Sequence, residues 1–223
     1  MAYSTSAAVL VWAQMSSGDL EVTMTDFDTT ITNFITYADD IIEEYCKVPS
    51  GFFDAAGVTV TDEYHDGRDV GHVTSWVRYT GHRKVPKLRL KYSPVISVTT
   101  LSEETSAGAW TARTEGRGDD YLVTETGVRF LQNIPSYDYK NVKVTYVAGY
   151  AATPSIIAIV SARLAANMLH RIIDSKSRTQ SAGLGSMSAG FGAEFMGVAK
   201  PILTQELKKM LRPYKRVSPT KII

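Results

Sequence analysis

The chain has few of the residues that support redox chemistry or tight zinc binding. Among its 223 residues only Cys46 is a cysteine, so an intrachain disulfide is excluded. A single thiol also excludes any zinc site with two or more cysteine ligands. We interpret Cys46 as a small apolar residue near a helix end, and a reducing cytoplasm as the simplest setting for folding.

The start of the chain lacks basic residues, and long hydrophobic runs are missing throughout. No lysine or arginine precedes Lys47, so the apolar run 7–13 does not fit a secretory signal, which needs a basic segment before its apolar core. No uninterrupted apolar run approaches the roughly 18 residues that a membrane-spanning helix requires. We therefore expect a soluble protein that is not exported by a standard route and binds no membrane.

Motifs of the common enzyme classes are also missing. The sequence contains no P-loop, no dinucleotide-binding glycine motif after a strand, no zinc-protease motif and no nucleophile elbow. The histidines fall at loop-like or helix-surface positions, and the group His65, Asp66, Asp69 and His72 matches no known metal-site spacing. We expect no catalytic residue, no cofactor and no metal; a catalytic site assembled from distant residues stays an alternative.

Charge is unevenly distributed along the chain, although the formal net charge is only +1. Residues 1–66 carry a net charge of −11, whereas residues 67–199 and 200–223 each carry +6. A chain polarised in this way can place its acidic part against the basic part of an identical neighbour. Solvated surface charge is the alternative for any single residue.

Hydrophobic periodicity predicts helices at both ends of the chain. Apolar residues recur every three or four positions over 25–46, with Thr25 and Asp28 as a capping box. Thr153 as N-cap and Pro154 begin a second helix over 154–173 that has only a narrow polar stripe. We also expect short helices at 4–15 and 201–211. The helices at 25–46 and 154–173 should pack together, because neither can bury its wide apolar face alone.

The middle of the chain favours strands. The stretches 88–92, 95–101 and 142–147 alternate or are β-branched, and residues 121–123 and 128–131 flank a hairpin turn at 125–127. Residues 102–120 are turn-rich and predict a loop anchored by Trp110. The fold class is therefore α+β, with a core of antiparallel helices, an inserted antiparallel β-sheet subdomain, and a C-terminal helix followed by an extended tail.

The expected organisation has five parts. Residues 1–50 form the N-terminal helices of the core, 51–150 the β-rich insertion, and 151–174 the second core helix. Residues 175–200 are rich in Gly, Ser and Met and predict a flexible segment, and 201–223 form the last helix and the basic tail.

A series of short matches in order resembles one protein family. They are the tetrapeptide Tyr64–Gly67, the strand 88–90 followed by 94–99, the tract 142–150 running into Pro154 and the helix residues 164–166, and the closing segment 211–216. Together they resemble the head–tail connector, or adaptor, proteins of tailed bacteriophages and related viruses. The resemblance spans about residues 25–216 and is least typical in 175–199 and in the length of the β insertion.

The resemblance implies a structural role in the virion. Copies of such adaptors, typically about twelve, form a ring beneath the portal of the capsid. The ring lies in the neck of the virion, extends the DNA channel, and contacts the portal protein and the neck or tail proteins. Assembly is expected in the host cytoplasm, and DNA would pass through the ring without sequence-specific binding.

Two sets of candidate interface residues follow. The C-terminal segment of these adaptors commonly reaches the portal, so we expect a portal interface at Lys208, Lys209, Arg212, Tyr214, Lys215 and Arg216. For contacts between neighbouring subunits, the acidic residues late in the helix 25–46 and the cations on the polar stripe of 154–173 are the candidates, namely Asp39, Asp40, Glu43, Glu44, Arg163 and Arg171.

The basic tail also allows a different function. A nucleic-acid-binding assembly protein could use the same cations on phosphates. Against this, the whole chain is nearly neutral, and Tyr214 is the one aromatic residue within the basic clusters.

Overall fold

The chain forms two compact units, which are described separately. A computed structural model describes residues 2–15, 24–70, 86–132, 134–136, 138–181 and 203–216, and for residues 24–27, 68 and 172–181 it describes only the backbone. The helical unit comprises Met1–Ser50 and Thr153–Ile223, and the β unit comprises Gly51–Ala152. The β unit is thus inserted between two halves of the helical unit.

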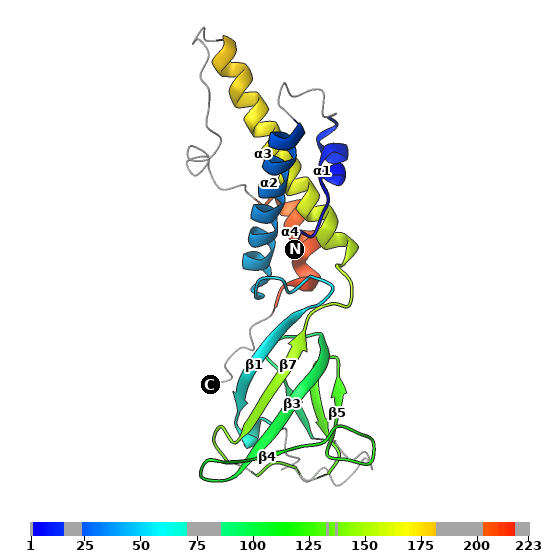
Figure 1. Ribbon diagram of the computed structural model, residues 1–223, viewed down its shortest axis with the longest axis vertical. Helices are drawn as coiled ribbons and strands as arrows, with labels where there is room; N and C mark the ends of the chain where they lie inside the picture. The colour runs from blue at the N-terminus through cyan, green and yellow to red at the C-terminus, as the bar shows by residue number, and fades with distance from the viewer. Residues whose placement is uncertain are drawn as a thin grey trace. The chain divides into compact units, whose positions relative to one another are not determined.

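The helical unit contains α1 (Ser6–Ala13), α2 (Met24–Cys46), α3 (Ser155–Ser181) and α4 (Gln205–Leu211) in its described part. α2 and α3 pack along each other in opposite directions, α1 packs on both, and α4 packs on α3 (Figure 1). The buried face of α2 consists of Ile31, Phe34, Ile35, Ala38, Ile42 and Cys46, which recur at helical spacing. This is the face that the sequence periodicity predicts.

The β unit contains two antiparallel sheets. In the first, β1 (Val58–His65), β7 (Val142–Ala148), β3 (Val95–Ser106) and β4 (Ala109–Ala112) lie in that order. In the second, β6 (Gly127–Phe130) lies between β2 (Lys87–Arg89) and β5 (Tyr121–Thr124). The strand β7 is central, and its residues alternate between buried and half-buried, as its sequence predicts.

Aromatic packing brings the two ends of the β unit together. The rings of Phe53 and Tyr150 are stacked with centroids 5.8 Å apart, and Phe52 contacts both edge-on. Gly149 has a positive φ of 135°, and a Cβ there would lie 2.5 Å from the Phe52 carbonyl oxygen. Glycine is therefore required at position 149, close to where the chain leaves this unit.

The hairpin predicted at 125–127 is present, since β5 and β6 are joined by the two residues 125 and 126. The loop predicted over 102–120 is wrong in its first half. β3 continues to Ser106 and pairs with β4, so Trp110 lies in a strand. Most serines and threonines of this hairpin are tolerated because they are at least partly solvated, whereas the buried Glu103 is paired with Arg113.

Helix boundaries differ from the prediction at three places. Ala158 N donates to the Pro154 carbonyl, so α3 begins one residue later than a Thr153 cap implies. α3 continues to Ser181 and includes the beginning of the segment predicted to be flexible; residues 182–200 lie outside the described part. α4 begins at Gln205 because the Thr204 hydroxyl accepts from Leu207 N, and a 3₁₀ turn, Arg212–Tyr214, follows it. α2 already includes Met24, so Thr25 lies inside the helix and not at its predicted cap position.

Candidate functional site

Two of the acidic residues predicted for subunit contacts are buried within their own chain. Asp39 is 5% exposed, and it accepts hydrogen bonds from the backbone N–H of Tyr3 (3.0 Å) and from the hydroxyl of Ser161 (2.5 Å). Glu43 is 7% exposed and accepts from the Tyr3 hydroxyl. These carboxylates hold the N-terminal segment against α2 and α3, and they are not available to a neighbouring subunit.

The other two acidic residues remain on the surface. Asp40 and Glu44 are exposed on the outer side of α2, four residues apart and therefore on one face of the helix. Tyr37 lies on the same side and is 41% exposed, although an aromatic ring gains most from burial. We call Tyr37, Asp40 and Glu44 the acidic face.

Arg163 links three helices of the helical unit. Its guanidinium group makes two contacts with the Glu206 carboxylate of α4, at 2.8 and 3.4 Å, and lies 5.0 Å from the centre of the Trp12 ring of α1. The hydrogen bond and charge of Arg163 lower the pKa of Glu206. Arg171, the other predicted cation, is exposed further along α3.

The C-terminal segment contacts the end of α2. Arg216 N donates to the Cys46 carbonyl at 2.9 Å, and the Lys215 ammonium lies 4.6 Å from the centre of the Tyr45 ring. A cation here also complements the negative end of the α2 dipole. Burial raises the pKa of the Cys46 thiol to about 12, against the opposing effect of Lys215. Lys215 and Arg216 therefore have a structural role in the fold.

Of the six residues predicted for the portal interface, Lys209 and Arg212 are the exposed ones. They lie three residues apart and therefore on the same side of the chain. Lys208, Tyr214, Lys215 and Arg216 are half-buried. The structure places all six in one short segment, but it leaves a different subset accessible than the sequence alone indicates.

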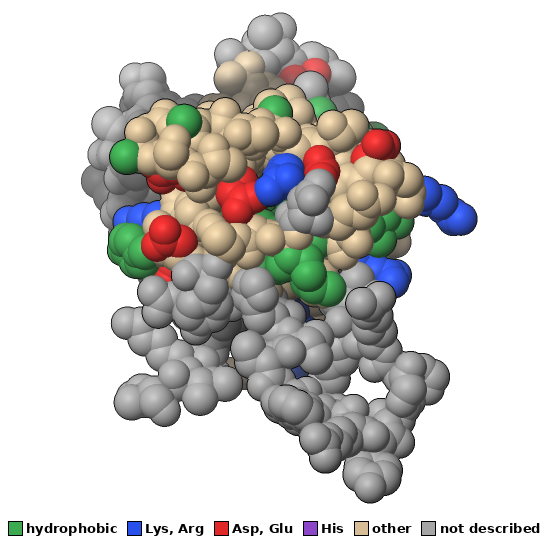
Figure 2. Space-filling model, turned by 90° about the horizontal axis from the view of Figure 1, so that it is seen from below, with side chains coloured by type: hydrophobic (Ala, Val, Ile, Leu, Met, Phe, Trp, Pro, Cys, Tyr) green, Lys and Arg blue, Asp and Glu red, His purple; other side chains and the backbone are tan. Residues whose placement is uncertain are grey.

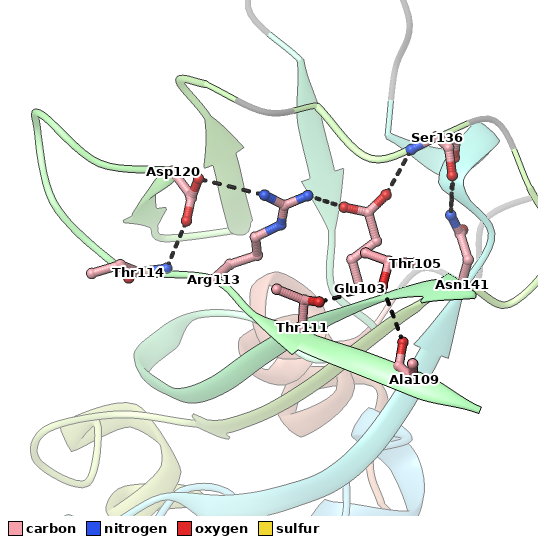
Figure 3. A network of polar contacts seen from close by, with 9 residues as sticks. All are labelled: Glu103, Thr105, Ala109, Thr111, Arg113, Thr114, Asp120, Ser136 and Asn141. Carbon is pink, nitrogen blue, oxygen red and sulfur yellow. Dashed lines mark hydrogen bonds and ion pairs between the residues drawn. The ribbon is translucent and has the colours of Figure 1, made fainter. Parts of the chain in front are cut away.

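A polar network joins β3 to the loops that precede β5 and β7 (Figure 3). Glu103 of β3 is 5% exposed, forms an ion pair with Arg113 and accepts from Ser136 N at 2.9 Å. Arg113 also lies 3.6 Å from Asp120. Asn141 donates to Ser136 at 3.0 Å. These contacts attach the loops before β5 and β7 to β3.

A second polar group joins β1 to β7 and to the segment after β2. Glu63 accepts from Tyr146 Oη at 2.6 Å and from Lys91 N at 2.8 Å, and its carboxylate lies 2.8 Å from His65 Nε2. Burial raises the pKa of Glu63, but the bonds from His65, Tyr146 and Lys91 outweigh it, and the net pKa is lowered. Burial and the bond to Glu63 raise the pKa of Tyr146. His65 lies in a strand, so predicting a loop position for it was wrong.

In the described part of the chain, no three His, Cys, Asp or Glu side chains gather into a possible metal site. Of the group considered from the sequence, His72 falls outside that part. The described helices also include none that is long and apolar enough to span a lipid bilayer.

Large apolar side chains are exposed on both units. In the β unit they are Tyr64, Ile96, Ile134 and Tyr139. Figure 2 shows that hydrophobic side chains lie in separate small groups among charged ones over its visible face. In the helical unit the most exposed are on α1, where Val11 is 75% and Trp12 is 45% exposed. The exposed apolar surface of α1 could have been predicted from its sequence, SAAVLVWA, which places apolar residues on every side of the helix.

Comparison with solved structures gives several similar chains, of which two are described here. A chain described as "Neck of empty GTA particle computed with C6 symmetry" is 16% identical, with a TM-score of 0.39, over 86% of this chain and 80% of that one. A chain of the "Virion of native gene transfer agent (GTA) particle" is also 16% identical, with a TM-score of 0.40, over 94% and 89%. Scores this low do not establish a common fold.

No protein-family description matches the chain, and no curated protein matches it either.

Proposed function

We propose that this chain is a structural protein of a virion neck, a head–tail connector subunit whose copies form a ring of about twelve between the portal and the neck or tail proteins. The observation that carries the proposal is the surface of the helical unit. It exposes Val11 and Trp12 on α1, and its α2 carries acidic side chains and no basic ones. The cations Arg163, Arg171 and Lys209 lie on α3 and α4, where the Glu206 carboxylate pairs with Arg163.

Such a surface favours association with copies of itself. A ring needs a heterologous interface, in which one face of a subunit meets a different face of the next. Segregated charge suits that arrangement, because a patch of one sign repels its own copy across a two-fold axis. The ordered resemblance to head–tail connectors supports the same assignment, and the ring would then extend the DNA channel.

The portal contact belongs to the C-terminal segment in this proposal. Lys209 and Arg212 are its exposed cations, and an acidic portal surface would attract them. Reversing Lys215 and Arg216 would be a poor test, because the Lys215 ammonium contacts the Tyr45 ring at the end of α2. The charge reversals Lys209→Glu and Arg212→Glu avoid this difficulty.

The experiment is a binding assay of the purified chain on portal-bearing capsids, followed by negative-stain imaging. We expect rings with a central hole at the portal vertex, and binding reduced about tenfold or more in the Lys209→Glu/Arg212→Glu variant. The matched control, Arg117→Glu/Lys140→Glu, makes the same charge change on exposed residues of the β unit and should bind normally. Failure of the unaltered chain to bind portals would contradict the proposal.

The alternative of a nucleic-acid-binding assembly protein predicts different behaviour in the same preparation. It requires DNA affinity that falls steeply with salt, and no ring particles. The contact of Lys215 with Tyr45 reduces the number of cations that the C-terminal segment can offer to phosphates.

A further inference from the structure

The helix α1 is too apolar for the place that it occupies. It has no charged residue, yet Val9 and Ala13 are the only two of its eight residues that are buried. A helix that is hydrophobic all round is normally covered on all sides. The outward side of α1 therefore presents apolar area to water, and covering it would be favourable by roughly 25 cal/mol per Å².

Trp12 is held in position before any partner arrives. The Arg163 guanidinium lies 5.0 Å from its ring centre, and Arg163 is fixed in turn by two contacts with Glu206. A side chain that is already ordered loses little entropy on binding, and Trp and Arg are the residues that most often anchor interfaces.

The neighbouring part of α3 extends this surface. Ile159 lies one helical turn before Arg163 and is 36% exposed. We call Val11, Trp12, Ile159 and Arg163 the anchor face. It combines apolar side chains with a cation, whereas the acidic face on α2 combines the Tyr37 ring with two carboxylates.

The two faces are complementary to each other, and neither is complementary to itself. Glu206 is 66% exposed, so its pairing with Arg163 is weakened by solvent and leaves the cation able to share a second carboxylate. Aromatic and apolar side chains on both faces can cover one another. The charge pattern thus selects a second copy of this chain as the occupant.

We infer that the anchor face of one copy docks on the acidic face of the next, with Val11 and Trp12 covering Tyr37 and with Arg163 facing Asp40 and Glu44. This inference rests on the proposed ring and names the surfaces that build it. Both faces lie on the helical unit and on different helices, as a head-to-tail contact requires.

The test uses two variants that each disable one face. Val11→Asp places a charge on the anchor face at a side chain that is 75% exposed, and Asp40→Lys/Glu44→Lys reverses the acidic face. Under conditions in which the unaltered chain forms rings, sedimentation should show each variant alone as a monomer. Their equimolar mixture should give dimers and nothing larger, because each partner retains one working face.

The control is Ile134→Asp, which makes the same kind of change at an exposed apolar residue of the β unit and should still form rings. Circular dichroism establishes that each variant is folded. If Val11→Asp is not folded, Val11→Ser replaces it, and we expect assembly about tenfold or more weaker than that of the unaltered chain.

The outcomes separate this inference from the proposed function. Rings formed by Val11→Asp, or a mixture that stays monomeric, would overturn the pairing of the two faces and leave the connector proposal standing. An unaltered chain that stops at a symmetric dimer would overturn the head-to-tail pairing. An unaltered chain that forms no ring, with or without portals, would overturn the proposed function itself.

Discussion

Glu63 shows how one half-buried carboxylate can make the β unit sensitive to acid. Its pKa lies below the usual value of 4.5, because three hydrogen bonds outweigh the effect of burial. A lowered pKa in the folded state contributes stability that is fully present above the unfolded value and is lost as the pH falls through the folded value. The β unit should therefore lose stability below about pH 4.5.

The corresponding prediction concerns Glu63→Gln. At neutral pH the variant should be less stable by about 1–3 kcal/mol, because His65, Tyr146 Oη and Lys91 N lose a charged acceptor. The difference between the two proteins should shrink as the pH falls below 4.5, the usual glutamate value. Urea unfolding at a series of pH values measures this. Glu125→Gln, at an exposed turn, is the control, and a gap that stays constant with pH would contradict the account.

Sequence reasoning did not reach the burial of the acidic residues late in α2. Glu43 and Glu44 in the last turn of α2 suggest a cationic partner, yet Glu43 accepts from the Tyr3 hydroxyl. Asp39, one turn earlier, accepts from Tyr3 N and from the Ser161 hydroxyl. Residue separations of 36 to 122 along the chain divide these groups, and no local pattern encodes such pairs. The expected cation at the end of α2, which could come from the same chain or another, is Lys215 of the same chain.

At the scale of elements, α2 and the β5–β6 hairpin could be predicted because their signals are local. α2 has a continuous apolar face, and the hairpin has a glycine at Gly127, whose φ is 149°. The β3–β4 hairpin could not be predicted in this way. Its residues are polar on both faces, so strand pairing, rather than periodicity, decides their conformation.

Glu103 provides a test of how the segment between β6 and β7 is attached to β3. Replacing it with Ala should cost about 3–5 kcal/mol, because Arg113 is left in a largely buried site with only Asp120 at 3.6 Å. The Ser136 backbone N–H would also lose its acceptor. Urea unfolding measures the effect.

Two further variants sharpen the interpretation. Glu115→Ala, at an exposed residue, should leave stability almost unchanged. Glu103→Leu/Arg113→Met should be less damaging than Glu103→Ala alone, since no buried charge remains without a partner. A double variant that is equally unstable would show that the ion pair is not the source of the effect.

At the scale of the molecule, the mixed α+β composition and the antiparallel strands follow from the sequence, because helical and alternating patterns occupy separate stretches. The accessible surfaces do not follow from it. Exposure of Trp12 depends on how α1 lies on α3, and exposure of Lys209 rather than Lys215 depends on where the C-terminal segment meets α2.

The division into units predicts that residues 51–152 fold alone. The unit has its own core of Phe53, Leu88, Leu101, Phe130 and Tyr146, and its ends meet at Phe52 and Gly149. We expect the excised segment to give a dispersed NMR spectrum and a cooperative thermal transition. The matched sample carries Gly149→Val, which should abolish the transition because the new side chain collides with the Phe52 carbonyl. A spectrum without dispersion for the unaltered segment would contradict the expectation.

The adjacency of Phe52 and Gly149 has a consequence for descent. Because the two ends of the β unit lie close together, the unit connects the flanking helices as a short loop would, whatever the number of residues in the unit. During evolution the β unit can therefore become longer, become shorter or be replaced without disturbing the packing of the helical unit. The sequence of the β unit could then change as its binding partners change, while selection keeps the helical unit able to associate with copies of itself.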